Sequence, residues 1–553
     1  MTLKKRSNIL KNILLPLALV LAVQWFDLHF DLTQDQRYTL DPSTISVLEA
    51  LDKPLKIDIF LSGKLPTDYL RFQREIQALI QSMEKYTDQL IVEYIDPFEG
   101  APDTAELVAE MNQYGLTPEY VISEQNQAVE QTVVFPWAMV NDGNRTISVP
   151  LIEKNLGDNQ QTIINRSIGQ IEFKFFDAFF KISQEQKKVL AVLTSHDTSE
   201  DVKIADLMRS LQSYYQLASF DLKALENDPI KTLENLKRFE LLMVSNPRVS
   251  FSEQEKYLLD QHLINGGKQL WMVNPVAINR DSLFNIKGSA VAIGNDLNMG
   301  NAFFKYGFRL EKNIIKDLYS APIVLATGAQ SQAQYLPIPW PYYPLVAPND
   351  NVIGNGISNL WFKFASTIDT VRSSATKTPL VSSSDFSKSV QTPITIALNE
   401  ASDKLVPSTF NQPHQTMGIL VKGSFSSAFE NRIKPVKINQ HRDKGKSQMI
   451  IFSDGTLAEN QVDKGSPLEL GYDKWTNNFY GNKRFLNNCI HYLMGNNALL
   501  EVRSKAVNMV VLDRELIAKK SNSWRIALLL LPLLILGLFG AIVTRWRKAK
   551  YGQ

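Results

Sequence analysis

The chain has 553 residues, of which 44% are apolar, and its 59 Lys and Arg nearly balance its 57 Asp and Glu. No basic block stands in the interior of the chain, so the sequence lacks the electrostatic footprint of a nucleic-acid-binding protein. The single cysteine, Cys489, excludes an intramolecular disulfide. A chain of this length can bury a sufficient core without one and allows two or three domains.

The N-terminal segment combines basic residues with a short apolar run. The run is "ILLPLALVLAVQWF", Ile13–Phe26, and the four basic residues before it are Lys4, Lys5, Arg6 and Lys11. We predict a cytoplasmic tail over residues 1–8 and a transmembrane helix over residues 9–26. A cleaved signal peptide is the alternative, for which Val20-Leu21-Ala22 is the best, and poor, cleavage site.

Residues 37–182 are predicted to form a first α/β domain. The stretches Leu55–Ser62 and Leu90–Pro97 predict strands, and an apolar helix face with Phe72 to Met83 lies between them. A hairpin is expected around Asn141-Asp142-Gly143, and a closing helix around Ile168–Phe180. This order resembles a thioredoxin-like fold, but without a Cys-x-x-Cys motif it excludes dithiol redox chemistry.

Residues 187–500 are predicted to form a second α/β domain. The runs "KKVLAVLTSH", "ELLMVSNP" and "KQLWMVNP" predict buried strands that alternate with helices. Ser252 and Glu255 form a capping box at the start of one helix, and Gly266-Gly267 ends it. Such alternation predicts a doubly wound parallel sheet. Residues 276–446 are too long for a loop and are predicted to be an insertion with some β structure of its own.

Polar residues follow the strands of this second sheet. They are His196, Asn246, Asn274 and Asp454. Ligands of open α/β sheets bind beyond the carboxyl ends of the strands, so these residues are a candidate binding site at one edge of the sheet. The alternative is that they cap the next helix or form a turn.

A second candidate lies in the Pro-rich stretch Tyr335–Pro348. Here Trp340, Tyr342 and Tyr343 are interleaved with prolines that we expect to keep them out of a regular sheet or helix. These aromatic residues would form either a contact surface or the packing of an irregular loop onto its own domain.

Motifs that would carry catalysis are absent from the sequence. Gly445-Lys446-Ser447 lacks the glycine five places earlier that a phosphate loop needs, since Gln440 stands there. Ser195-His196-Asp197 are consecutive and cannot converge as a hydrolytic triad. Cys489 lies on an apolar helix face, and the six histidines show no metal-ligand spacing. We therefore expect no enzymatic activity, metal or cofactor.

After a membrane-proximal segment, residues 501–523, the sequence predicts a transmembrane helix over residues 524–544. Its centre, Ile526–Thr544, has no charged residue and would span roughly the 30 Å hydrocarbon core of a bilayer. The small residues Gly537, Gly540 and Ala541 would allow close approach of another membrane helix.

The tail over residues 545–553 carries four basic residues, which are Arg545, Arg547, Lys548 and Lys550. By the positive-inside rule, this tail and the basic N-terminus both lie in the cytoplasm. The bulk of the chain is then expected outside the cytoplasm.

Several longer segments carry a family resemblance. They are "DQRYTLDPSTISVLEALDKPLKIDIFLSG", "EYIDP", "GNAFFKYGFRLEKNIIKDL", "MIIFSDGTLAENQV" and "PLELGYDKWTNNFYGNKRFLNNCIHYLMGN". Together they resemble the gliding-associated ABC transporter auxiliary family GldG of Bacteroidetes. The resemblance implies a bacterial inner (cytoplasmic) membrane protein with a periplasmic bulk. It also implies a multi-span ABC permease as partner and, through it, a cytoplasmic ATPase.

Two functions of different class remain open. The first is a membrane-anchored auxiliary subunit whose periplasmic domains couple to or regulate the permease. The alternative is a tethered periplasmic binding module for a glycan or peptide. A degenerate amidotransferase-like hydrolase would have the right sheet, but no nucleophile stands at a strand end.

Overall fold

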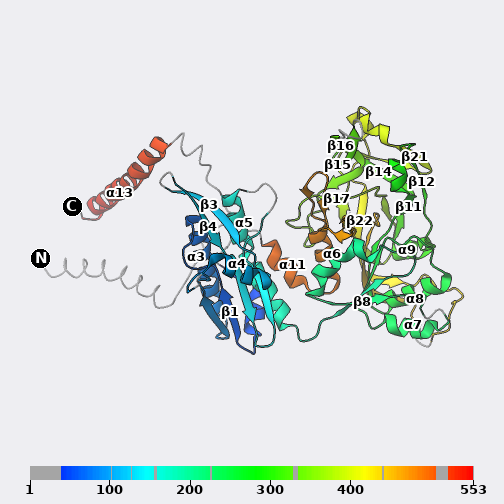
Figure 1. The fold of residues 1–553 in the computed structure, drawn as a ribbon, viewed down its shortest axis with the longest axis horizontal. Helices are drawn as coiled ribbons and strands as arrows, with labels where there is room; N and C mark the ends of the chain where they lie inside the picture. Colours follow the sequence, from blue (N-terminus) through cyan, green and yellow to red (C-terminus); the bar gives the residue numbers. More distant parts are fainter. Residues whose placement is uncertain are drawn as a thin grey trace. The chain divides into compact units, whose positions relative to one another are not determined.

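The computed structural model describes residues 39–100, 103–125, 128–154, 159–224, 227–327, 334–438, 441–505 and 521–551 (Figure 1). The chain divides into two compact units, Met1–Ala506 and Val507–Gln553. The helix predicted over residues 9–26 lies outside the described residues.

The first part of the larger unit is a four-stranded sheet in the order β2-β1-β5-β6. The parallel strands β1 (Leu55–Ile59) and β2 (Leu90–Tyr94) are joined by α3 (Thr67–Glu84), and β5 (Trp137–Asn141) and β6 (Thr146–Pro150) form an antiparallel hairpin. The predicted strand-helix-strand unit and hairpin are therefore confirmed.

The remaining elements of this part are α2, α4, a two-stranded ribbon and α5. Their bounds are α2 (Pro42–Glu49), α4 (Thr104–Gln113), β3 (Glu119–Gln125), β4 (Ala128–Val134) and α5 (Gln160–Ser183). Helix α5 packs on α3, β5 and β6, while its Phe176 is fully buried in the core of a second sheet. Helix α5 therefore packs against the first sheet and also contributes a side chain to the core of the second.

The second sheet has seven strands in the order β19-β22-β23-β10-β9-β7-β8. Its five parallel strands are β7 (Val189–Leu193), β8 (Gln216–Phe220), β9 (Leu241–Ser245), β10 (Lys268–Met272) and β23 (Lys444–Phe452). The chain first adds β8 on one side of β7 and then adds β9, β10 and β23 on the other. The predicted doubly wound parallel arrangement is present, with its reversal point between β7 and β9.

Helices cover both faces of this sheet because alternate strand residues point to opposite faces. On one face α6 (Asp201–Gln212) and α10 (Asn482–Leu493) share a core with the strands, and on the other α7 (Pro229–Leu236) and α8 (Glu253–Ile264) share a second core. A further helix, α11 (Asn497–Ser504), packs on α2, α5 and α10.

Helix α8 begins and ends where the sequence predicts. The Ser252 backbone N–H donates to the Glu255 carboxylate at 2.8 Å, and Ser252 Oγ accepts from the Glu255 N–H at 3.3 Å, which is the reciprocal capping box. Gly266 follows the helix with a φ of 100°, in the left-handed region that glycine adopts without strain.

Residues 276–446 are not wholly an insertion. Two strands from this segment, β19 (Ala375–Ser382) and β22 (Thr416–Ser426), extend the main sheet antiparallel beside β23. The sequence could not indicate this, because the partner strand β23 stands further along the chain and strand pairing leaves no local pattern. The rest of the segment does form β structure of its own, as predicted.

This remaining β structure consists of short sheets and turns. Its strands are β11 (Val276–Ile278), β12 (Ser289–Gly294), β13 (Phe308–Leu310), β14 (Asn313–Asp317), β15 (Ser320–Thr327), β16 (Gln334–Val346), β17 (Leu360–Trp361), β18 (Ile368–Thr370), β20 (Ser387–Gln391) and β21 (Ile394–Ala397). Its helices are α9 (Gly300–Tyr306) and the 3₁₀ turns η1 (Arg280–Phe284), η2 (Leu398–Ser402) and η3 (Pro407–Thr409). Two hairpins follow β23, formed by β24 (Val462–Asp463), β25 (Ser466–Pro467), β26 (Tyr472–Asp473) and β27 (Asn478–Phe479).

The smaller unit contains the helix α13 (Ser521–Tyr551), drawn in red in Figure 1. Within Leu528–Lys550, the most apolar window of 18 residues has a mean hydropathy of 2.3 and no buried share. Helix α13 is the one helix among the described residues that is long and apolar enough to cross a membrane, by length and composition. Helix α13 contains the whole of the predicted segment 524–544.

The buried His262 makes the stability of the fold depend on pH. Its ring lies beneath Gly267, where a Cβ would meet Nε2 at 2.2 Å, and complete burial lowers the His262 pKa from 6.5 to about 4. Between pH 6.5 and about pH 4, His262 is protonated in the unfolded chain but stays neutral in the folded chain. The free energy of unfolding therefore falls as the pH falls through this window.

We expect His262→Gln to remove this pH dependence, because a glutamine amide can donate to the Phe239 carbonyl, which the ring contacts at 3.3 Å, but does not titrate. Between pH 6.5 and 4, the free energy of unfolding should fall by about 3 kcal/mol less in the variant than in the unaltered protein. Denaturant unfolding across this range measures the difference. The control is His414→Gln, since the His414 side chain is 70% exposed. Parallel losses for His262→Gln and the unaltered protein would contradict the prediction.

Candidate functional site

The carboxyl edge of the second sheet brings two of the predicted residues together. Asn246 follows β9 and Asn274 follows β10, and the Asn274 amide donates to the Asn246 carbonyl oxygen at 2.8 Å. Asn274 Oδ1 in turn accepts from the backbone N–H of Gly455, after β23, at 2.7 Å. Three adjacent strand ends are joined in this way, next to the reversal point of the sheet.

Glu459 completes this network and was missed by the sequence analysis. Its Oε1 accepts from Asn246 Nδ2 at 2.9 Å and from Ser199 Oγ at 2.8 Å, while its Oε2 lies 3.8 Å from the Arg280 guanidinium. Glu459 lies in the turn that follows β23, where no periodic pattern marks it. An acidic residue shortly after a strand end was the available signal.

Gly455 allows the loop after β23 to approach the two asparagines. A Cβ at this position would lie 2.6 Å from Asn246 Oδ1 and 2.8 Å from Asn274 Nδ2, closer than real Cβ atoms come to other heavy atoms. The close packing therefore requires glycine.

Asp454 anchors a different set of backbone groups. The side chain is fully buried, and its Oδ2 accepts from the Lys363 N–H at 2.7 Å. Its Oδ1 accepts from both the N–H and the hydroxyl of Thr456 at 2.8 Å. Burial raises the Asp454 pKa above its ordinary value, against these hydrogen bonds. Asp454 thus holds the loop in shape.

His196 lies apart from the asparagine pair. Its φ is 67°, and its buried ring stacks on Phe251 at a centroid distance of 4.0 Å. Nε2 lies 3.2 Å from the Glu255 carboxylate at the start of α8. Burial lowers the His196 pKa, although Glu255 opposes the effect. The histidine therefore belongs to the helix start rather than to the asparagine network.

The four predicted edge residues consequently do not present one shared set of free polar groups. The side-chain oxygens of Asn246, Asn274 and Asp454 all accept hydrogen bonds from the protein itself. Such an arrangement ties strand ends together and shapes turns, as the alternative interpretation of these residues proposed.

The aromatic candidates occupy a strand, contrary to the expectation for this Pro-rich stretch. Trp340, Tyr342 and Tyr343 lie in β16, which pairs with β15 and β17. Within this strand Pro337, Pro339 and Pro341 alternate, and a fourth proline, Pro344, lies beyond the register shift in the pairing with β15. The missing N–H groups of the three alternating prolines therefore all fall on the same edge of the strand.

All three aromatic side chains are buried in the core of this smaller β region. Tyr342 donates its hydroxyl to Glu400 at 2.9 Å, and Lys316 lies over the Tyr342 ring at 4.3 Å. In the described chain these residues therefore pack inward and do not form an exposed aromatic surface.

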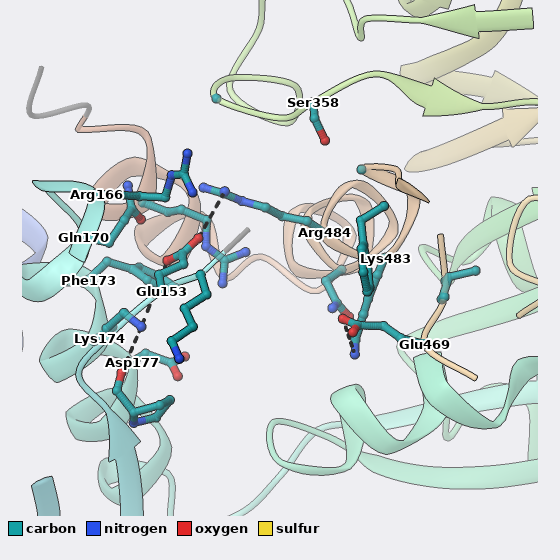
Figure 2. Close-up of a pocket in the computed structure, with 18 of the residues that line it drawn as sticks. Glu153, Arg166, Gln170, Phe173, Lys174, Asp177, Ser358, Glu469, Lys483 and Arg484 are labelled. Carbon is teal, nitrogen blue, oxygen red and sulfur yellow. Dashed lines mark hydrogen bonds and ion pairs between the residues drawn. The ribbon is translucent and has the colours of Figure 1, made fainter. Parts of the chain in front are cut away.

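A cavity of about 1100 Å³ lies in the larger unit, lined by β6, α5, α10, α11 and the turns before α10. Figure 2 shows Lys174 and Glu153 on one side and Lys483 and Arg484 on the other. Seven of the described lining residues are cationic and three are acidic. The cationic residues are Lys154, Arg166, Lys174, Lys181, Lys483, Arg484 and Arg503, and the acidic ones are Glu153, Asp177 and Glu469.

The sequence analysis did not find this cavity. Its lining comes from three separate stretches, within 147–181, 356–358 and 469–503, and none contains a recognisable motif. The available signal was the helical stripe Arg166, Gln170, Lys174, Asp177 and Lys181 on α5, whose spacing of three or four places these side chains on one helix face.

The membrane-helix candidates Gly537, Gly540 and Ala541 all lie on α13. Within the described part of the smaller unit, no atom outside the helix's own backbone lies within 4 Å of a Cβ placed at either glycine. In the described parts of the chain, no group of three or more His, Cys, Asp or Glu is placed to hold a metal ion.

We expect Asp454→Ala to destabilise the protein by about 3 kcal/mol, because it leaves two partly buried N–H groups and a partly buried hydroxyl without their acceptor. Thermal and denaturant unfolding measure the loss. Asp369→Ala is the control, since Asp369 is 49% exposed and pairs with Arg309 at the surface, and it should cost less than about 1 kcal/mol. Equal losses in the two variants would show that the hydrogen bonds of Asp454 contribute no more to stability than the surface ion pair of Asp369 does.

Comparisons with known proteins complete this picture. A search of curated proteins finds no match. Among solved structures, the mmIFT52 N-terminal domain matches 56% of this chain and 97% of its own at 12% identity and a TM-score of 0.31, which is too low to support an argument.

Two family models match the sequence. A domain of unknown function matches residues 34–141, which include the strand-helix-strand unit of the first sheet. A family described as an ABC-type uncharacterized transport system matches residues 187–489, more than half of the chain, from β7 to α10. The protein therefore belongs to this family of auxiliary components of ABC-type transport systems.

Proposed function

We propose that this protein is a membrane-anchored auxiliary subunit of an ABC transporter complex, whose domains outside the cytoplasm couple to or regulate the permease. The observation that carries the proposal is the family match over residues 187–489, which spans the second sheet. The permease, and through it a cytoplasmic ATPase, are the proposed partners.

Helix α13 supports the membrane anchor. The uncharged segment Ile526–Thr544 of α13 extends roughly 28 Å as a helix, close to the thickness of the hydrocarbon core of a bilayer. The leucines of this span are exposed in the chain alone, a surface that water disfavours and lipid accepts. The basic residues after Thr544 support a cytoplasmic C-terminus and hence a periplasmic bulk at the inner membrane.

The position of Gly445-Lys446-Ser447 supports a partner as the source of energy. These residues lie inside strand β23, and the Ser447 hydroxyl donates to the Gly267 carbonyl at 2.7 Å. A phosphate loop instead joins a strand to a helix and turns its backbone N–H groups toward the nucleotide. The proposed role is therefore not enzymatic.

The association with gliding motility rests on the sequence resemblance to the GldG family. One resembling segment, Gly300–Leu318, covers α9, β13 and β14, and another, Met449–Val462, covers the end of β23 from Met449 to Phe452 and the Glu459 turn. The resemblance thus includes residues that shape the fold of the family-matched region.

A tethered binding module for a glycan or peptide is the second candidate function. The cavity beside α5 favours it, since its volume of about 1100 Å³ would hold a ligand larger than most small molecules. The two functions are compatible, because a regulatory subunit can also bind a ligand.

We expect the double change Gly537→Leu and Gly540→Leu to weaken co-purification with the permease several-fold, because the leucines would keep a partner helix from close approach. Extraction in mild detergent followed by mass spectrometry measures the recovered permease and ATPase. The matched control is Gly537→Ala with Gly540→Ala, which keeps both positions small. Undiminished recovery with the leucine pair would mean that these positions do not form the contact.

The topology can be tested with single introduced cysteines, because native Cys489 is buried and its pKa is raised by burial, which keeps it unreactive. Lys464 lies in an exposed hairpin turn and Lys550 near the end of α13. We expect Lys464→Cys to react with a membrane-impermeant maleimide in intact spheroplasts, and Lys550→Cys to react only after permeabilisation. The opposite pattern would contradict a periplasmic bulk.

A further inference from the structure

We propose that the cavity beside α5 is a binding site for a ligand that carries two or more phosphate groups. The proposal does not rest on the transporter role, because it is argued from the charges and hydrogen bonds of the cavity itself.

Most of the peripheral cations of the cavity have acidic partners. Lys181 pairs with Asp177 at 2.6 Å, Lys483 pairs with Asp206 at 3.0 Å and with Glu469 at 3.3 Å, and Lys154 pairs with Glu119. These pairs are locally neutral. Among the described contacts, the cations without a close acidic partner are those around Glu153.

Lys174 and Arg484 share Glu153 as their described acidic contact, and neither pair is close. Lys174 Nζ lies 4.0 Å from one carboxylate oxygen of Glu153, and an Arg484 terminal nitrogen lies 4.0 Å from the other (Figure 2). Lys174 instead donates to the backbone carbonyls of Pro150 and Ile152, at 2.8 and 3.0 Å. One distant carboxylate cannot neutralise two cations.

Arg484 also has an unused hydrogen-bond donor. Its Nε is buried and has no hydrogen-bond partner in the part of the chain that the structure describes. A guanidinium donates through Nε and a terminal nitrogen together to two oxygens of a phosphate. Because Nε itself is closed to solvent, a phosphate in the cavity would contact the terminal nitrogens first, and Nε would join them only after a turn of the side chain.

Arg503 adds a third cation that neutral groups hold in place. Its guanidinium donates to Asn488 Oδ1 at 2.9 Å and stacks on the Phe173 ring at 4.1 Å. Neither partner carries a negative charge, so the position of Arg503 is fixed while its charge remains uncompensated. A ligand would therefore meet a preorganised cation.

The pKa values reflect this excess of positive charge. Burial lowers the Arg484 pKa, and the Arg503 charge lowers it further. Burial also lowers the Lys174 pKa to about 8, with Arg503 acting in the same direction against Glu153 and Asp177. An anion in the cavity would relieve both effects, because a nearby negative charge favours the protonated forms.

The cavity has room for more than the phosphates. Phe173, Phe479 and Tyr480 also line it and offer apolar surface to an organic group attached to the phosphates. The ligand class is therefore a phosphorylated organic molecule, either soluble or presented as a lipid headgroup.

The test uses the full chain in a neutral detergent and inorganic tripolyphosphate as the probe, with binding measured by calorimetry at low salt. We expect saturable binding that Arg484→Gln weakens at least tenfold and that Arg484→Lys weakens less. Arg309→Gln is the control, because Arg309 is 57% exposed and pairs with Asp369 away from the cavity, and it should bind as the unaltered protein does. Melting temperatures check that each variant is folded.

Two further arms of this experiment identify the ligand. Citrate should bind at least tenfold more weakly than tripolyphosphate, and equal binding would overturn the phosphate assignment. Short-chain cardiolipin in the micelle, which carries two phosphates, should compete with tripolyphosphate if the natural source is a lipid headgroup, and should not if the source is soluble. Tripolyphosphate binding that Arg484→Gln leaves unchanged would overturn the proposal.

The affinity for tripolyphosphate should also depend on pH through Lys174. The charged groups around Lys174 are Glu153, Asp177, Arg484 and Arg503. Between pH 7 and 9.5 Lys174 loses its proton, so we expect at least a threefold loss of affinity, although the probe itself gains negative charge. In Lys174→Met the affinity should be lower at pH 7 and should no longer fall with pH. An unchanged decline in this folded variant would exclude Lys174 from the site.

Discussion

The packing of helix α5 is the constraint on which the larger unit depends. The helix buries Phe175 and Phe179, and its Phe176 enters the core under the second sheet, while α3, β5 and β6 pack against it. The side chains of Arg166, Gln170, Lys174, Asp177 and Lys181 form a polar stripe on α5, and this stripe lines the cavity.

The same helix explains why cations can gather there. Glu172 of α5 accepts from the Asp41 N–H at 2.6 Å and from the Thr44 hydroxyl at 3.0 Å, and it pairs with Lys505 at 2.7 Å. These contacts attach α2 and the end of α11 to α5, independently of the charges in the cavity. Arg503, two residues before Lys505, is thereby held close to other cations at a cost in stability that the surrounding packing offsets.

The sequence was most informative where short-range physics decides the structure. Three features could each be predicted from a few consecutive residues. They are the capping box of Ser252 and Glu255, the apolar strand Val189–Leu193 and the apolar helix face of α3. The β19 and β22 strands could not be predicted, because pairing with β23 depends on residues far away in the sequence. Of the candidate site residues, Asn246 and Asn274 do meet, since parallel strands end at one edge.

Glu459 and the cavity escaped prediction for a related reason. Glu459 acquires its partners only when the turn after β23 folds back over β9, and Arg484 meets Glu153 only because α10 and the segment after β6 come together in the folded chain. In the sequence these residues read as ordinary surface charges. What distinguishes Glu459 is its set of partners, and what distinguishes Arg484 is a buried Nε without a described partner, and both are properties of the tertiary structure.

A ligand in the cavity would lie next to the last described element before the membrane helix. Arg503 belongs to α11, the last described element of the larger unit. A ligand can shift a conformational equilibrium only by the difference between its affinities for the two states. An anion that contacts Arg503 would favour the state in which α11 remains packed on α5 and α10. Binding at this cavity would therefore stabilise α11 directly, and any effect on the membrane helix would have to pass through that packing.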